Sequence, residues 1–129
     1  MASYLTSFLN VNGYDYPAPK RGFQYVISTI VNAGRNVNGS AIGQRVGRDQ
    51  YKLDAMQWPG LDPPMRRMML QSLEPFYVPV TFEDYRTGLP ITLIMYPGDR
   101  TGRPLFIDEL TYIVTKDESL AFNLIDAGR

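Results

Sequence analysis

The sequence predicts a small, mostly β protein, an antiparallel β-sandwich or partial barrel flanked by one α-helix. Three observations lead to this class. Short apolar runs that alternate with polar residues recur along the chain, and this period of two is typical of half-buried strands. Gly, Pro, Asn and Asp, which favour turns, separate the runs. One segment alone has apolar residues at helical spacing.

The clearest element is a β-hairpin within residues 76–96. Residues 76–82 alternate between apolar and polar side chains, and residues 91–96 form a second run rich in β-formers. The loop between them is polar and ends on Gly88, which can take a positive φ. Pro79 has no N–H to donate to a ladder, so we expect its strand to lie at a sheet edge there, or to be bulged. Pro97-Gly98 is expected to end the hairpin in a turn.

The N-terminal half reads as further strands and loops. Residues 1–22 contain the turn signal Asn12-Gly13 and are either a strand of the same fold or an N-terminal arm that pairs with a neighbouring subunit. Residues 23–31 predict a strand with both faces partly buried. Residues 32–39 are a polar loop, and residues 40–48 are ambiguous because two glycines weaken a strand there. Residues 49–58 predict a strand with Tyr51, Leu53 and Ala55 on one face.

The helix is predicted over residues 62–74. Asp62 can cap it, Pro63 suits its first turn, and Pro75 stops it. A short apolar stripe follows the i, i+3, i+4, i+7, i+8 spacing and consists of Met65, Met68, Met69, Ser72 and Leu73. A helix this short does not persist alone, so we expect the stripe to pack against the sheet as core.

The C-terminal part predicts shorter strands. Residues 99–104 read as a charged loop, residues 105–107 and 110–115 as short β segments, and residues 116–118 as a polar turn. Residues 120–125 predict a final alternating strand. There is no internal repeat or linker, so residues 1–129 are expected to form a single domain.

The amino-acid composition argues against several classes of function. Thirteen basic and thirteen acidic residues give zero net charge, which argues against a protein that grips nucleic acid or anionic lipid. The chain has no Cys and no His, so disulfides, Cys nucleophiles and His acid–base chemistry are excluded. No apolar run approaches the ~20 residues of a membrane helix, and the N-terminus does not resemble a signal peptide.

No motif for chemistry stands out. Residues 43–48 lack the Lys-Ser/Thr of a phosphate-binding loop, and residues 49–54 lack the Gly and Glu of a calcium loop. The acidic residues in or beside turns are expected to be solvated, namely Asp84, Asp99, Asp108 and Glu109. We therefore expect a protein that is not an enzyme and needs no metal or cofactor.

The residues favoured for an interface lie in loops and at the expected edge. Arg45 and Arg48 either face a partner's carboxylates or pair locally with Asp49 or Asp54. Asp99 and Arg100 lie in a Pro/Gly-framed turn that is able to clamp a neighbouring loop. The full set of candidate interface residues is Gly34, Arg35, Asn36, Asn38, Arg45, Arg48, Pro79, Asp99 and Arg100.

Five segments resemble a family of small proteins from phages and prophages of Gram-positive bacteria, whose genes lie among tail genes. They are residues 21–35, 46–54, 58–61, 76–82 and 95–100, of which the last, Met-Tyr-Pro-Gly-Asp-Arg, is the most distinctive. The order of elements is also similar to the tail-tube fold, a β-sandwich with a flanking helix that forms rings. The resemblance implies that edge strands pair between subunits and that residues 32–48 are a long hairpin reaching the next ring. No catalytic residue comes with it.

The leading expectation is therefore a virion structural protein of a phage tail (tail tube, distal tail or tail tip). It would assemble with itself in a ring, hexameric by analogy, and contact neighbouring tail proteins. It would be located in the virion tail after assembly in the host bacterial cytoplasm, with no membrane and no sequence-specific nucleic-acid partner. The alternative is a carbohydrate- or ligand-binding β module of a baseplate, in which aromatic rings stack on sugars from Tyr14, Tyr16, Trp58 and Tyr85.

Overall fold

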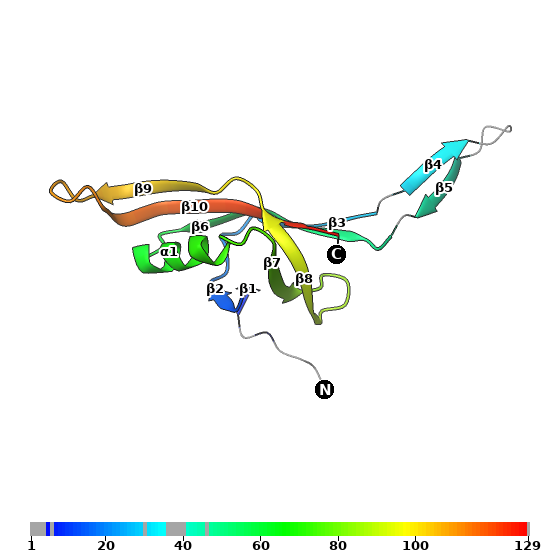
Figure 1. The fold of residues 1–129 in the computed structure, drawn as a ribbon, viewed down its shortest axis with the longest axis horizontal. Coiled ribbons are helices and arrows are strands. Elements are labelled where there is room, and N and C mark those ends of the chain that lie inside the picture. Colours follow the sequence, from blue (N-terminus) through cyan, green and yellow to red (C-terminus); the bar gives the residue numbers. More distant parts are fainter. Residues whose placement is uncertain (1–4, 6, 30, 36–40, 46, 129) are drawn as a thin grey trace.

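The computed structural model describes residues 5, 7–29, 31–35, 41–45 and 47–128. Its elements, in chain order, are β1 (Leu9–Val11), β2 (Tyr14–Tyr16), β3 (Gln24–Ser28), β4 (Val31–Arg35), β5 (Ala41–Arg45), β6 (Gln50–Pro59), α1 (Pro63–Ser72), β7 (Val78–Glu83), β8 (Pro90–Pro97), β9 (Thr101–Ile107) and β10 (Val114–Asp126). Figure 1 shows a central body from which two hairpins extend in opposite directions.

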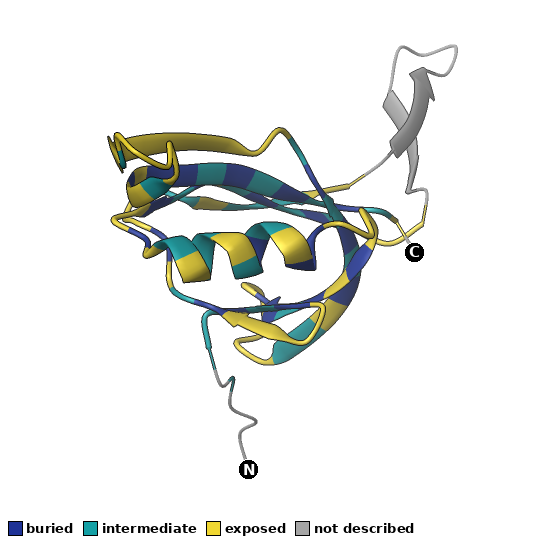
Figure 2. Cartoon of the chain, turned by 60° about the vertical axis from the view of Figure 1, so that its left-hand side comes forward, coloured by how far each residue is buried: buried dark blue, intermediate teal, exposed yellow. Residues whose placement is uncertain are grey.

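Eight of the strands form one antiparallel sheet in the order β2-β1-β7-β8-β10-β6-β3, with β9 paired to β10 beside β8. The sheet does not close into a barrel, since β2 and β3 lie at the two ends of this order. Figure 2 shows that it curves around α1, so that the helix lies on its concave side. The predicted class, antiparallel and mostly β with one flanking helix, is confirmed.

The core fills the space between the curved sheet and the helix. Trp58 of β6 and Phe122 of β10 lie side by side with ring centroids 4.9 Å apart, and Tyr16 of β2 meets both edge-on. The Trp58 Nε1–H donates to the carbonyl of Pro17 at 2.7 Å, which satisfies its polar atom. The other fully buried large side chains are Leu9, Leu53, Met56, Met69, Phe82, Met95, Leu120 and Leu124.

The helix lies where the sequence predicts it, and its apolar stripe faces the core as expected. Met69, Ser72 and Leu73 are buried, and Met65 and Met68 pack against the core while partly exposed. Asp62 occupies the N-cap position, but its side chain makes no capping hydrogen bond. The start of α1 instead relies on proline in its first turn, where a missing N–H costs nothing.

Within residues 1–22, β1 and β2 are strands of the main sheet. β1 and β2 pair through the Asn12-Gly13 turn, whose residues both have positive φ, as a tight hairpin requires. β1 also pairs with β7. Leu9, Val11 and Tyr16 are completely or almost completely buried, so this hairpin is part of the core.

The β7–β8 hairpin confirms the predicted central element, with pairs from Val78–Met95 to Glu83–Pro90. The expectation that Pro79 marks an edge is wrong, because β7 lies between β1 and β8. The carbonyl of Pro79 accepts a hydrogen bond from the Asn12 N–H at 2.8 Å and therefore faces β1. The N–H that proline lacks would face the same side, where β1 has already reached its turn. No bond to β8 is lost.

The predicted face of β6 is wrong beyond Leu53 because the strand contains a β-bulge. Phe122 of β10 pairs with Met56, but Leu124 pairs with Leu53, so two residues of β6 lie opposite Asn123. Ala55 takes a φ of 56°, and its N–H donates to the Asn123 side-chain oxygen at 2.9 Å. The bulge exposes Ala55 and turns Met56 and Trp58 inward, next to Leu53 on the buried face.

The C-terminal third is one long hairpin, not the three short segments and two turns predicted. β8 and β9 lie in succession along the same edge of β10, so the Pro97-Gly98 segment is a bend and not a chain reversal. β9 begins at Thr101, inside the expected charged loop, and the expected turn at 116–118 lies within β10. Every residue of β9 is exposed, so no burial pattern marks it in the sequence.

β4 and β5 form a separate two-stranded hairpin, paired from Val31–Arg45 to Arg35–Ala41. The paired residues fall within the 32–48 segment expected to form a long hairpin, apart from Val31 at its start. Figure 1 shows the hairpin extending away from the body, at the end opposite to the β9–β10 hairpin.

Candidate assembly surfaces

The structure separates the nine candidate interface residues. Gly34, Arg35 and Arg45 belong to the β4–β5 hairpin, and Asn36 and Asn38 lie outside the described residues. Pro79 lies inside the sheet, as described above. The remaining residues, Arg48, Asp99 and Arg100, lie at two different places on the body.

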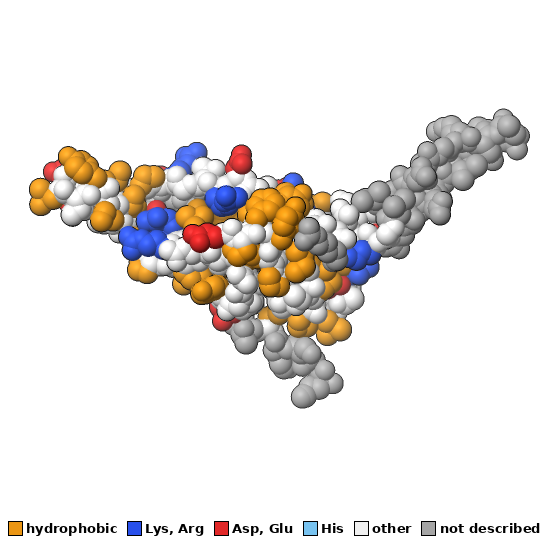
Figure 3. Space-filling view, in the orientation of Figure 1, with side chains coloured by type: hydrophobic (Ala, Val, Ile, Leu, Met, Phe, Trp, Pro, Cys, Tyr) orange, Lys and Arg blue, Asp and Glu red, His pale blue; other side chains and the backbone are white. Residues whose placement is uncertain are grey.

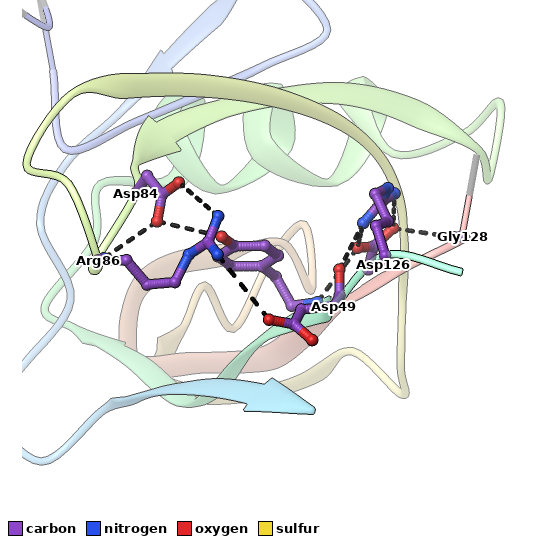
Figure 4. Close-up of polar contacts among 7 residues, drawn as sticks. Asp49, Asp84, Arg86, Asp126 and Gly128 are labelled. Atoms are coloured by element: carbon purple, nitrogen blue, oxygen red, sulfur yellow. Dashed lines mark hydrogen bonds and ion pairs between the residues drawn. The ribbon is translucent and has the colours of Figure 1, made fainter. Parts of the chain in front are cut away.

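Arg48 follows the β4–β5 hairpin and forms an intramolecular ion pair. Its guanidinium donates to both carboxylate oxygens of Asp126, at 2.5 and 2.8 Å. Of the predicted local partners, Asp49 accepts a hydrogen bond from the Arg48 guanidinium through its backbone carbonyl at 2.9 Å, whereas Asp54 lies 3.6 Å from the Lys52 ammonium. The pairing with Asp126 is topological in origin, because β10 pairs with β6 and its last residue comes to lie beside the start of β6. A bidentate pair of this kind is geometrically specific, and it fixes the base of the hairpin to the end of the chain (Figure 4).

Asp126 is a buried carboxylate that accepts several hydrogen bonds. Besides Arg48, it accepts the N–H groups of Tyr51 at 3.1 Å and Gly128 at 2.8 Å. Burial acts to raise the pKa of Asp126, but these hydrogen bonds outweigh it and hold the pKa below its ordinary value. The group is ionised at neutral pH and serves as a structural clamp.

A second polar cluster, Asp84 with Tyr51 and Arg86, lies near the first (Figure 4). Asp84 accepts the Tyr51 hydroxyl at 3.1 Å and the Arg86 backbone N–H at 3.0 Å, and it pairs with the Arg86 guanidinium at 3.5 Å. Burial opposes ionisation of Asp84, yet these donors leave its pKa lowered. Asp84 was expected to be solvated but is buried; its bonds hold the β7–β8 loop against β6.

Asp99 and Arg100 lie in the bend between β8 and β9, and both are exposed. Arg100 donates to the carbonyl of Gly98 at 3.1 Å, so its guanidinium lies back on its own bend. The same bend is fixed by the Gly98 N–H, which donates to the carbonyl of Asn123 at 3.0 Å. The two residues remain at the surface, far from the β4–β5 hairpin in the fold.

Among the described residues, six of the eleven exposed large hydrophobic side chains lie on the β9–β10 hairpin, which we call the arm, and the sequence analysis missed this surface. Its turn contains Leu110, exposed by 89%, and Tyr112, exposed by 81%. Leu105, Phe106 and Ile107 on β9 and Ile113 beside the turn are also about half exposed or more. Figure 3 shows hydrophobic side chains gathered at this end of the molecule. The missed signal was that residues 105–107 are apolar on both faces of a strand whose neighbours are charged.

The arm has a fixed shape. At its turn, the Asp108 carboxylate accepts the N–H groups of Leu110 at 2.7 Å and Thr111 at 3.0 Å, and these bonds lower the pKa of Asp108. At its base, Arg66 of α1 donates to the buried carboxylate of Asp117 at 2.7 Å. The Asp108 contacts fix the turn, and the Arg66–Asp117 contact ties the base of the arm to α1.

A second exposed apolar cluster, the aromatic platform, consists of Phe76, Tyr77 and Tyr96. The Phe76 ring stacks on Tyr96 with centroids 5.4 Å apart, and Tyr77 meets both rings edge-on at 4.9 and 5.9 Å. Phe76 and Tyr77 are nearly half exposed. The sequence placed Phe76 and Tyr77 in the alternation of a strand, but β7 begins at Val78 and Phe76 takes a φ of 71°. This backbone conformation breaks the alternation.

The aromatic residues proposed to stack on sugars do not form one surface. Trp58 and Tyr16 are buried in the core, and burial raises the pKa of Tyr16 to about 12. Tyr14 and Tyr85 are exposed on different elements. Tyr85 stacks on Tyr25 with centroids 4.9 Å apart, and the two line a shallow pocket of about 400 Å³ together with Phe23 and Gln24.

Within the described ranges, acidic side chains form no group of three that would hold a metal ion. Over the same residues, no helix has the length and apolar character needed to cross a membrane. Comparisons with protein-family models, with curated proteins and with solved structures returned no match for this chain.

Proposed function

We propose that this protein is a structural subunit of a phage or prophage tail that works by assembling with copies of itself, without catalysis. The tail context rests on the resemblance of its five sequence segments to small tail-associated proteins. In this role the copies form a ring, hexameric by analogy with tail tubes, which contacts neighbouring tail proteins. The subunit is made in the host cytoplasm and ends in the virion.

The observation that carries the proposal is the exposed apolar surface of the arm. Taking the roughly 150–250 Å² of a large aromatic side chain as the scale, its six exposed side chains present roughly 600 Å² to solvent. This matches the largest apolar patch of a typical monomer, which is often functional. A surface of this size, on a hairpin whose base is tied to α1 by Arg66–Asp117, favours a role in association.

Comparing the free energy of burying the arm's apolar surface with the cost of association indicates that a single arm contact is weak. Covering roughly 600 Å² at about 25 cal/mol per Å² contributes about 15 kcal/mol. Association costs about 4–15 kcal/mol in lost freedom. One contact is therefore close to balanced, whereas a closed ring gives every copy two contacts. We expect assembly to be cooperative and to depend on protein concentration or on a template.

A second candidate function is carbohydrate binding at the shallow pocket beside Tyr25 and Tyr85. Stacked aromatic side chains with an adjacent amide, here Gln24, suit a sugar ring. The pocket is open and shallow, and two of the four aromatic residues first considered are in the core.

Sedimentation velocity from micromolar to millimolar concentration, with electron microscopy of any particles, separates the two functions. The assembly proposal expects a large particle whose amount rises steeply with concentration. A chain that stays monomeric at millimolar concentration and binds a panel of oligosaccharides, with Tyr85→Ser abolishing binding, would replace assembly with sugar recognition.

A further inference from the structure

Two exposed apolar surfaces of this chain lie on different parts of the fold and have matching chemistry. The arm presents Leu110 and Tyr112 at its turn, and the body presents Phe76 and Tyr77 on the platform. Hydrophobic side chains gather at the arm's end in Figure 3. Figure 1 places the turn of the arm at one end of the molecule, whereas β7 and β8, which adjoin the platform, lie near its centre. One chain therefore cannot cover its own platform with its own arm.

Both surfaces are built around an aromatic residue with left-handed backbone. Four non-glycine residues of the described chain have positive φ: Asn12, Ala55, Phe76 and Tyr112. Asn12 lies in a tight Asn-Gly turn and Ala55 in a β-bulge, so the surrounding pairing accounts for both. Phe76 and Tyr112 are large side chains that disfavour this conformation, and each holds its ring at the surface. Strain kept at exposed aromatic residues points to a binding role.

The arm is suited to side-chain packing and not to strand addition. β9 carries Pro104 in its middle, and its pairing with β10 shifts register between Val114 and Ser119. Proline and bulges are devices that prevent an exposed strand from pairing with another chain. The adhesive part of the arm is therefore its apolar side chains.

The two surfaces are of similar size. At the roughly 150–250 Å² of a full aromatic side chain, Leu110 and Tyr112 expose roughly 300 Å² and Phe76 with Tyr77 roughly 200 Å². A standard interface buries roughly 800 Å² on each partner, so these apolar areas form the centre of the contact and the surface around them must supply the rest. Aromatic residues at the centre of such a contact are typical hot spots.

We propose that the arm turn of one copy, with Leu110 and Tyr112, packs onto the aromatic platform of the next copy, with Phe76 and Tyr77. This inference rests on the proposed self-assembly and specifies its contact. Because the two surfaces differ, the contact is head-to-tail, and repeating it produces a ring or a filament instead of a two-fold dimer.

The test uses one variant for each surface. Leu110→Ser with Tyr112→Asn removes the arm contact, and Phe76→Asn with Tyr77→Ser removes the platform; Asn suits the left-handed positions. Leu89→Ser and Tyr85→Ser remove exposed apolar side chains elsewhere and serve as matched controls. Circular dichroism checks that each chain folds, and the single variants Leu110→Ser and Tyr77→Ser replace any double variant that does not.

Sedimentation velocity should show that each surface variant alone raises the dissociation constant of self-association about 30-fold or more, as expected for the loss of one hot spot. Both controls should assemble like the wild type. An equimolar mixture of the arm and platform variants should form a one-to-one dimer that grows no further, since the platform variant still has an arm and the arm variant still has a platform.

The possible failures are distinguishable. If the wild type assembles and neither surface variant weakens it, the contact is wrong while the proposed function stands. If Tyr85→Ser abolishes assembly, or the mixture forms no dimer, the arm does not pack on this platform. A wild type that remains monomeric at millimolar concentration overturns both the contact and the proposed function.

Discussion

Arg48 and Asp126 form a bidentate ion pair across 78 positions of the sequence, joining the base of the β4–β5 hairpin to the last residue of β10. The Asp126 side chain is fully buried, whereas that of Arg48 is 39% exposed. The pair therefore lies at the boundary between solvent, which reaches Arg48, and the interior, which holds Asp126. The pair holds the Arg48 guanidinium to the fold while part of the side chain remains exposed.

Replacing Asp126 with Asn should destabilise the protein at neutral pH by about 1–3 kcal/mol, because buried donors lose their charged acceptor. The pKa of Asp126 is lower in the folded state than in the unfolded state. Its stabilising effect is therefore complete above the unfolded pKa of about 4 and is lost as pH falls through the folded value. Urea unfolding from pH 7 to pH 2 should show the two proteins converging in acid, with exposed Asp99→Asn as control. Parallel curves would exclude the clamp.

Met69→Ala should lower the free energy of unfolding by about 2–5 kcal/mol, since Met69 is completely buried between α1 and the sheet. Met68→Ala on the same helix should cost less, because Met68 is partly exposed. Denaturant melts of the two variants provide the comparison. An unchanged midpoint for Met69→Ala would contradict the packed helix.

Tyr16→Phe should remove the hydroxyl that contacts the Met69 carbonyl at 2.8 Å and the Ser72 hydroxyl. The expected loss is about 1 kcal/mol at neutral pH. Burial raises the folded pKa of Tyr16 to about 12 from 10.0, so its contribution falls as pH rises from about 10 toward 12. Alkaline unfolding should therefore be steeper in the wild type than in Tyr16→Phe. Tyr14→Phe, at an exposed site, should leave the curve unchanged.

Deleting residues 34–39 should leave the main sheet folded and weaken assembly if the β4–β5 hairpin also contacts a neighbour. The expectation follows from its separate two-stranded sheet, which shares no ladder with the eight-stranded one. The far-ultraviolet circular dichroism and the unfolding midpoint should be close to those of the wild type. A large loss of stability would show that the hairpin supports the core.

The sequence predicted the elements that are half buried. The α1 stripe and the β7–β8 hairpin carry clear periodicity, because one face of each packs on the core and the other meets solvent. The Asn12-Gly13 turn was readable for a similar reason, since the backbone conformation demands those residue types. Local chemistry and burial are both visible in residue order.

The features that the sequence analysis did not predict depend on contacts between distant parts of the chain. The bulge at Ala55 is held by Asn123, and the ion pair of Arg48 needs Asp126. No local pattern encodes either partner. The arm was not predicted because every residue of β9 is exposed, so its sequence shows no alternation of buried and exposed positions. The prediction from Pro79 was wrong because the sequence does not show the order of strands in the sheet. Only that order tells which neighbouring strand the missing N–H of Pro79 would face.

The course of β10 has a mechanical consequence. This strand runs from the turn of the arm, along β6, to Asp126, which forms an ion pair with Arg48 at the base of the β4–β5 hairpin. A pull on the arm along its length is directed along β10 and tends to slide it against its neighbours. The ladder bonds then bear the load in parallel and must yield together, instead of opening one after another like a zipper. A fold built this way is expected to transmit tension from one end to the other with little stretch.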